Sequence, residues 1–181
     1  MTVFDLWKPI VATGIATHIW STLAWTALPH HKPEWTRVPA EDELQDLIAE
    51  KKIPAGQYMF PFAESGKEAT SEEFQQKNAK CRGMLIVWAT PLTMGAAIVK
   101  TLLWFFAIAF TIGYLSSLAL DPGEKFQKVI QFVTTAGLLA HVAAHFPHVF
   151  WFRRKISMEV VDGVIQALLT GVIFAALWPS A

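Results

Sequence analysis

Long apolar stretches dominate the chain, and one extended polar stretch interrupts them. A helix needs about 20 apolar residues to cross the hydrocarbon core of a bilayer. Four stretches meet this length: residues 9–28, 92–120, 127–152 and 156–178. The polar residues 29–90 separate the first stretch from the second. The pattern predicts an all-α membrane protein, a bundle of four transmembrane helices with a small extramembrane α/β module inserted between the first two.

The second predicted span has an ambiguous start. The segment "GMLIVWATPLTMGAAIV" (residues 83–99) is short for a span and is broken by Pro91. Its first half, "MLIVWA", is rich in β-branched and aromatic residues, which favours a strand that ends at the proline. We therefore expect the helix to begin near Pro91 or Leu92. A re-entrant segment or a fifth span is the alternative.

The inserted residues 29–90 contain signals for short elements. "AEDELQDLIAEKK" (residues 40–52) has an amphipathic helical pattern with acidic residues in its first turn. "TSEE" (residues 70–73) matches a capping box and predicts a helix through Lys80. "IPAGQYMFPF" (residues 53–62) has turn and strand residues without a helical period. A module of this size could hardly fold alone, so we expect it to pack on the bundle or on a partner.

Small residues recur four positions apart in the predicted spans, which lets helix backbones approach closely in a membrane. Gly113 lies in such a series in the second span. The longest series are Gly163, Ala167, Gly171 and Ala175 in the fourth span, and Ala136, Ala140 and Ala144 in the third, with His148 next. The series predict a compact bundle, and chance is the rival explanation because Ala and Gly are common in membrane helices. Tryptophans at the span ends, such as Trp25, fit an interfacial belt.

Composition agrees with a membrane protein and excludes some functions. The chain is 53% hydrophobic and only 17% charged, whereas soluble domains carry about 25% charged residues. Its 181 residues suit a single membrane domain. The net charge of zero argues against nucleic acid as a partner. The single cysteine, Cys81, excludes an internal disulfide framework and a multi-cysteine metal site.

Basic residues predict the orientation of the chain. The loop 153–155 is entirely basic, and the insertion carries eight more Lys or Arg residues. With four spans these two regions lie on one side, and the opposite side carries only Lys8, Lys125 and Lys128. The positive-inside rule then places residues 29–90 and 153–155 in the cytoplasm, with both termini outside. We expect the membrane to be a bacterial inner membrane.

Three histidines lie close together in the third span, in "LLAHVAAHFPHVF". Residues four and seven positions apart fall on one helix face, so His141, His145 and His148 share an arc of about 60°. Unpaired imidazoles are costly in lipid, and we therefore expect all three to face the bundle interior. The short loop 153–155 makes the third and fourth spans antiparallel and brings Asp162 to the depth of His148. We expect His145 or His148 to hydrogen-bond Asp162, or to share a metal or water with it.

Two constellations of these residues predict different cofactors. His18 and His141 lie at matching depth near mid-membrane, as the axial ligands of a haem b would. The second constellation lies nearer the loop 153–155 and consists of His145, His148, Asp162, His30, His31 and Glu34. Imidazole together with carboxylate in a partly dry site suits Zn, Cu(II) or Fe.

Each constellation also has a purely structural explanation. A histidine within a span can hydrogen-bond a neighbouring helix without binding a ligand. Asp162 can pair with Arg153 or Arg154, and "PHH" (residues 29–31) can be an interfacial turn. These alternatives remain open at the level of the sequence.

The remaining evidence for function is mostly negative. The sequence has no Gly-rich phosphate loop, no nucleophile elbow and no H-E-x-x-H motif, which favours a non-enzymatic role but leaves an enzyme open. We expect an accessory or structural subunit of a larger membrane complex, respiratory or otherwise energy-transducing, that contacts lipid and other subunits or a second copy of itself. The alternatives are a haem b or metal-binding redox protein that uses the histidines, and a small transporter or channel component.

Overall fold

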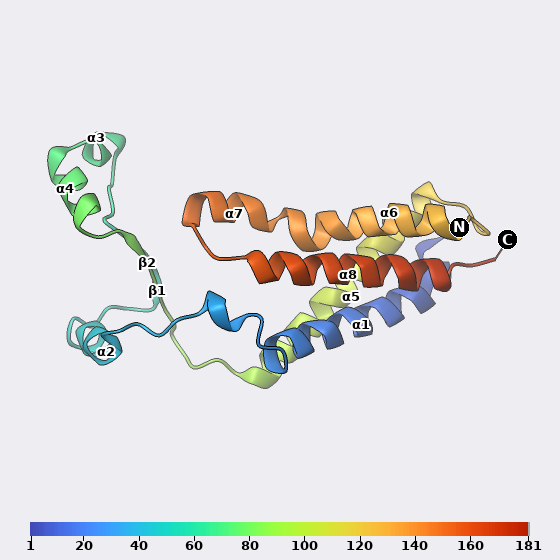
Figure 1. Ribbon diagram of the computed structural model, residues 1–181, viewed down its shortest axis with the longest axis horizontal. Helices are drawn as coiled ribbons and strands as arrows, with labels where there is room; N and C mark the ends of the chain where they lie inside the picture. Colours follow the sequence, from blue (N-terminus) through green and yellow to red (C-terminus); the bar gives the residue numbers. More distant parts are fainter. Residues whose placement is uncertain (181) are drawn as a thin grey trace. The chain divides into compact units, whose positions relative to one another are not determined.

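The computed structural model describes residues 1–180 and is mostly helical (Figure 1). It divides into two compact units. The helical unit consists of Met1–Thr36 together with the chain from Met94 onward, and the insertion unit consists of Arg37–Thr93. The predicted insertion began at residue 29. In the structure residues 29–36 group with the helical unit through contacts with α8, and the extramembrane location of residues 29–90 stays a prediction.

The helical unit contains five α-helices and three short helical turns among the described residues. These are η1 (Val3–Leu6), α1 (Trp7–Thr26), η2 (Lys32–Glu34), α5 (Met94–Ala119), α6 (Phe126–Leu138), η3 (Leu139–Ala143), α7 (His145–Phe152) and α8 (Ser157–Ala176). α6 packs along α8, and α1 packs along both α5 and α8. In Figure 1 orange α6 runs beside red α8 and α7 continues the same segment past η3, while blue α1 lies below α8 and the fainter yellow-green α5 passes behind.

Three helical stretches within residues 1–180 are long and apolar enough to cross a membrane. They are Met94–Ala119, Phe126–Phe152 and Ser157–Ala176, and they correspond to the second, third and fourth predicted spans. α1 has 20 residues, about 30 Å of helix, but it is not in this group. Threonine, serine and histidine side chains lower its hydropathy. The composition of three helices thus suggests membrane integration, and the first predicted span, residues 9–28, stays a prediction.

An apolar core fills the end of the helical unit that contains the chain termini. Its fully buried side chains include Leu6, Val129, Val133 and Phe174. These residues come from η1, the start of α6 and the end of α8, so the core joins segments that are distant in sequence. Backbone bonding reinforces this end, because the amide of Gly123 donates to the carbonyl of Pro179.

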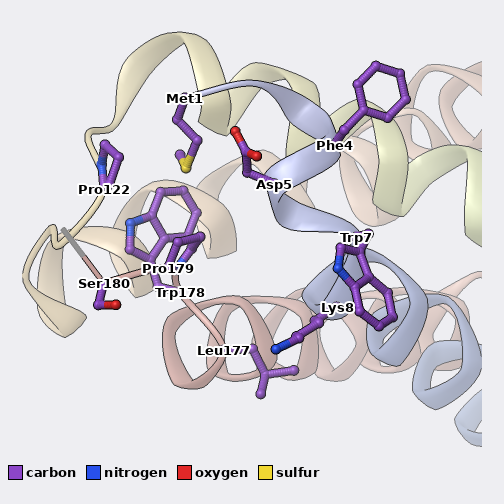
Figure 2. Close-up of a pocket in the computed structure, with 10 residues that line it drawn as sticks. All are labelled: Met1, Phe4, Asp5, Trp7, Lys8, Pro122, Leu177, Trp178, Pro179 and Ser180. Carbon is purple, nitrogen blue, oxygen red and sulfur yellow. The ribbon is translucent and has the colours of Figure 1, made fainter.

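An open pocket of about 630 Å³ lies at the same end, between η1 and the residues after α8 (Figure 2). Trp7, Lys8 and Trp178 contribute to its wall, and the Lys8 Nζ lies 5.9 Å from the centre of the Trp7 ring. The Trp178 indole donates to the carbonyl of Asp121. Aromatic and basic side chains of this kind are typical of the region where a helix leaves a membrane.

Small residues let α6 and η3 approach α8 closely. A Cβ on Gly163 would lie 2.6 Å from the His141 carbonyl oxygen, and one on Gly137 would lie 2.9 Å from the Cα of Ala167. On α8 the contact face includes the predicted series, since Gly163, Ala167, Gly171 and Ala175 are all buried. In α5, Gly113 is also buried, against Ile10.

The contact face of the third predicted span differs from the expected one. Gly137 and His141 face α8, whereas Ala140, Ala144 and His148 are exposed and Ala136 is half-buried. The helix also changes its winding at η3, a π-helical turn, and α7 restarts at His145. A π-turn inserts one residue into the helical repeat and rotates the following side chains by about 100°. Pro147 lies just beyond this break and cannot donate a backbone hydrogen bond.

The insertion unit contains three helices and one antiparallel strand pair. Its elements are α2 (Glu41–Glu50), β1 (Gly56–Phe60), α3 (Gly66–Ala69), α4 (Glu72–Lys80) and β2 (Gly83–Val87). β2 lies where the sequence predicts a strand before Pro91. The predicted capping box begins one residue too early, because the hydroxyl of Ser71 accepts the amide hydrogen of Phe74 and Thr70 ends α3.

Candidate metal centre

The turn after α1 carries two adjacent histidines and one carboxylate. The sequence "PHHKPEW" (residues 29–35) follows the end of α1 at Thr26. The amide of Lys32 donates to the carbonyl of Pro29, and the amide of Glu34 donates to the carbonyl of His31. These short-range bonds form the 3-10 turn η2, which brings His30, His31 and Glu34 close together.

α8 supplies the carboxylate that both imidazoles contact. Asp162 lies in the second turn of α8 and is only 6% exposed. Its Oδ1 lies 3.1 Å from the Nε2 of His30, and its Oδ2 lies 2.8 Å from the Nε2 of His31. Each oxygen of the buried carboxylate therefore has an imidazole partner, as a buried charge requires.

The carboxylate of Glu34 accepts hydrogen bonds from the other nitrogen of His31 and from the start of α8. Its Oε2 lies 2.7 Å from the Nδ1 of His31. Its Oε1 accepts the backbone N–H of Met158 at 2.9 Å and the hydroxyl of Ser157 at 3.4 Å. A carboxylate at a helix N-terminus is also favoured by the helix dipole. Glu34 therefore fixes both the orientation of the His31 ring and the position of the turn on α8.

Packing restricts the His31 ring further. Trp25, in the last turn of α1, stacks on it with ring centroids 3.9 Å apart and an interplanar angle of 9°. His31 is 5% exposed as a result. The Lys155 ammonium donates to the carbonyl of Pro33 at 3.2 Å, which ties the loop 153–155 to the same turn. The imidazole thus has one orientation before any ligand binds.

The electrostatics of this turn favour a cation. Burial lowers the pKa of His31, but hydrogen bonds to Glu34 and Asp162 outweigh burial, so its pKa lies above the ordinary value. Burial raises the pKa of Glu34, but the hydrogen bonds from His31 and Met158 outweigh it and hold that pKa below the ordinary value. Two carboxylates with two neutral imidazoles would leave two buried negative charges. Protons or a metal ion must therefore compensate them.

The spacing of the donor atoms fits one metal ion. His30, His31 and Asp162 each offer one ligand atom, and these atoms all lie within 4.8 Å of one another. Ligands about 2.1 Å from one ion at tetrahedral angles lie about 3.4 Å apart, so small side-chain movements complete the geometry. Two imidazoles and one carboxylate suit Zn²⁺, Fe²⁺ or Co²⁺. Glu34 supplies the hydrogen bond to the far imidazole nitrogen that metal-binding histidines usually have.

The predicted direct hydrogen bond from His145 or His148 to Asp162 was wrong, and a metal or water shared between them stays a prediction. Neither His145 nor His148 hydrogen-bonds it among the described residues, because His30 and His31 occupy both of its oxygens. The Nδ1 of His145 instead lies 3.5 Å from Glu159, whose other oxygen accepts a hydrogen bond from Arg154. His148 is exposed and packs near Phe152. Of the three clustered histidines, only His141 is buried.

An open cleft of about 270 Å³ lies against Asp162 in the helical unit. Trp25 and Arg154 contribute to its wall, and the remaining lining residues are Ser21, His141, His145, Glu159, Asp162 and Gln166. Gln166 and Ser21 were not predicted as site residues. Gln166 follows Asp162 by one helical turn, and a second polar residue at that spacing in an apolar helix was the available signal.

His18 and His141, the predicted haem ligands, both pack on Phe105. The ring centroid of Phe105 lies 6.3 Å from that of His18 and 6.1 Å from that of His141. Among the described residues, the buried Nδ1 of His18 and Nε2 of His141 have no hydrogen-bond partner. Haem binding stays a prediction, which the visible spectrum of the purified protein tests.

Comparisons with protein-family models, curated proteins and solved structures found no match to this chain. The geometry of the site therefore carries the functional argument.

Proposed function

We propose that this chain is a polytopic membrane protein that binds a divalent transition-metal ion between His30, His31 and Asp162. One observation carries the proposal: two imidazole nitrogens and a carboxylate oxygen from distant parts of the sequence lie within 4.8 Å of one another. The hydrogen bond that Glu34 accepts from His31 and the stacking of Trp25 support it, because both hold His31 ready for a ligand. The apolar helices support the membrane location.

The competing explanation is a proton in place of the metal. A protonated His31 between Glu34 and Asp162 satisfies both carboxylates, and its raised pKa agrees with that state. The two explanations differ in a measurable quantity, since only the first predicts bound metal.

The loop 153–155 is at the same end of the helical unit as the ligands, because Lys155 bonds the turn that carries them. The positive-inside rule supports placing this end in the cytoplasm, with α1 as a fourth span. We propose a bacterial inner membrane as the location.

Metal content tests the proposal. The full-length protein in mild detergent is stripped with a chelator, incubated with Zn²⁺ and desalted, and its zinc is measured by mass spectrometry. We expect one equivalent of Zn²⁺ in the wild type and a loss of it in His31→Ala and in the isosteric Asp162→Asn. His148→Ala, which removes an exposed imidazole, should retain zinc. A wild type that binds no more zinc than His31→Ala contradicts the proposal.

A role as an accessory subunit is the second candidate, and the strand pair of the insertion unit favours it. Met59 lies opposite Met84 in the pair, and Met59, Met84, Ile86 and Trp88 are all exposed. Apolar side chains that gather on one small unit are typical of a surface that a partner covers.

Native mass spectrometry of protein extracted gently from its own membranes tests this second candidate. We expect a mass larger than one chain, and we expect Met59→Ser combined with Ile86→Ser to release the additional component. Val38→Ser is the matched control, because Val38 is an exposed apolar residue of the same unit outside the strands. A single chain in the wild type, or an assembly that survives the double substitution, argues against this role.

A further inference from the structure

The metal site has fewer protein ligands than a closed site requires. His30, His31 and Asp162 provide three donor atoms. Structural zinc sites have four protein ligands, whereas sites with three leave a position for water or substrate. Glu34 is not available as the fourth ligand, because its oxygens bond the His31 ring and the first turn of α8. At least one coordination position is therefore left to a ligand from outside the chain.

The cleft meets the metal site at two residues. Asp162 belongs to both, since its oxygens contact the two imidazoles and its side chain lines the cleft. Trp25 also belongs to both, because it stacks on His31 and lines the cleft. A ligand that enters the cleft thus meets one metal ligand, Asp162, and the ring that stacks on another, His31.

Two buried polar atoms of residues that line the cleft have no hydrogen-bond partner among the described residues, and a small ligand in the cleft could provide one. His141 is only 7% exposed, and its Nε2 has no hydrogen-bond partner among the described residues. The Oε2 of Glu159 is also buried without a hydrogen bond among the described residues, and the Nδ1 of His145 lies 3.5 Å from it. Buried polar atoms without partners are rare and usually mark a missing water or ligand. One water occupies about 30 Å³ of liquid, so 270 Å³ is ample for several.

The charges around the cleft limit the ligand to a small one of low charge. A divalent ion is neutralised by Asp162 and Glu34, and Arg154 is paired with Glu159. The cleft therefore has no excess charge to hold a large polyanion. Its donors and acceptors suit water, which offers both, or a monoanion that accepts from an imidazole.

We infer that this cleft gives water and small monoanions access to an exchangeable coordination position of the metal ion. The inference rests on the proposed metal site and assigns that site to the open, ligand-exchanging class. His141 and Glu159 are positioning residues here: the His141 ring can donate to a monoanion or to water, the Glu159 carboxylate can accept only from water, and both leave the metal to His30, His31 and Asp162.

Cobalt(II) in place of zinc makes the coordination visible. The stripped full-length protein in detergent is loaded with Co²⁺, its d–d absorption is recorded, and sodium azide is titrated in. We expect a saturable change in the d–d bands of the wild type. Ser21→Phe fills the cleft and should weaken azide binding by about tenfold or more, while Co²⁺ is still bound. Thr22→Phe adds the same ring at the next, exposed position of α1 and should leave azide binding unchanged.

The outcomes separate this inference from the proposed function. A protein that binds no Co²⁺ overturns the metal site and the inference with it. If the wild type binds Co²⁺ but its d–d spectrum does not change with azide, the metal site is supported and the inference is overturned. This outcome does not depend on whether Ser21→Phe folds. An azide response that is equal in the wild type and in folded Ser21→Phe shows that the ligand arrives by another route, which also overturns it.

Discussion

The two ends of the helical unit are stabilised by different interactions. At the end with the termini, apolar side chains such as Val133 and Phe174 are buried against one another. At the other end, the turn after α1 is held on α8 by hydrogen bonds from its histidines to Asp162 and from the amide of Met158 to Glu34. The buried face of α8 shows the change along one helix, since Asp162 and Gln166 give way to Thr170 and then to Phe174.

The comparison separates stability from function. Apolar packing is non-directional and tolerates many side-chain combinations of suitable volume. Buried ionic groups are poor stabilisers, because their desolvation offsets much of the attraction between them. Ionisable residues within membrane segments are costly and usually mark a functional site. The polar end is therefore where binding chemistry is expected, and the apolar end is where the bundle is held together.

The largest effect on stability should come from the apolar end. Phe174→Ala removes a fully buried ring and leaves a cavity, which should lower the free energy of unfolding by about 3 kcal/mol. Zinc affinity should stay the same, because Phe174 is three helical turns from Asp162. Denaturant titration in detergent micelles measures the first effect, and equilibrium zinc binding measures the second.

Leu168→Ala is the matched control for Phe174→Ala. It shortens an apolar side chain on the same helix, but Leu168 is about half exposed, so its removal leaves no closed cavity. An equal loss of stability in both variants would show that the end with the termini is not the packing core of the bundle.

At the polar end, a substitution should change the affinity for zinc more than it changes stability. Glu34→Gln weakens the hydrogen bond that orients His31, and loss of such a bond lowers metal affinity about 10–100-fold. Stability should change less than in Phe174→Ala. Glu50→Gln, at an exposed position, should bind zinc as the wild type does. Unchanged zinc affinity in Glu34→Gln would mean that His31 is oriented without the carboxylate.

The sequence predicts which helices and strands form better than it predicts which residues contact one another. Hydropathy is a local property, so the three apolar helices could be read directly, as could the strand before Pro91. The same residues that form the site were also candidates. The sequence placed His30, His31, Glu34 and Asp162 in one predicted constellation, but it suggested His145 and His148 as the direct partners of Asp162, whereas the turn η2 brings His30 and His31 there. A turn at residues 29–31 was one of the alternatives, but the sequence did not indicate that it packs against Asp162.

The π-turn η3 explains the other difference. A regular helix through residues 127–152 predicts that His141, His145 and His148 share one face. The extra residue of the π-turn changes the phase, so His141 stays buried and His148 becomes exposed. Sequence periodicity assumes a constant repeat and therefore fails beyond such a break.

The smallest expected change lies where this break meets α8. Gly163→Ala would place a methyl group 2.6 Å from the backbone oxygen of His141, and a backbone atom cannot rotate away as a side chain can. η3 must therefore shift from α8, which should cost about 1–2 kcal/mol of unfolding free energy. Thermal or denaturant unfolding in micelles measures it.

Gly95→Ala is the control for this last prediction, and it should change the free energy of unfolding in the opposite direction. Gly95 lies in α5 with no atom near its prospective Cβ, so alanine there should stabilise the helix by about 0.5–1 kcal/mol. The two substitutions make the same chemical change, and only the close approach of η3 distinguishes them. Gly163 is also adjacent to Asp162, so a displaced η3 moves His141 in the wall of the cleft. If both variants are stabilised equally, α8 and η3 are not in close contact, and the cleft does not have the wall described for it.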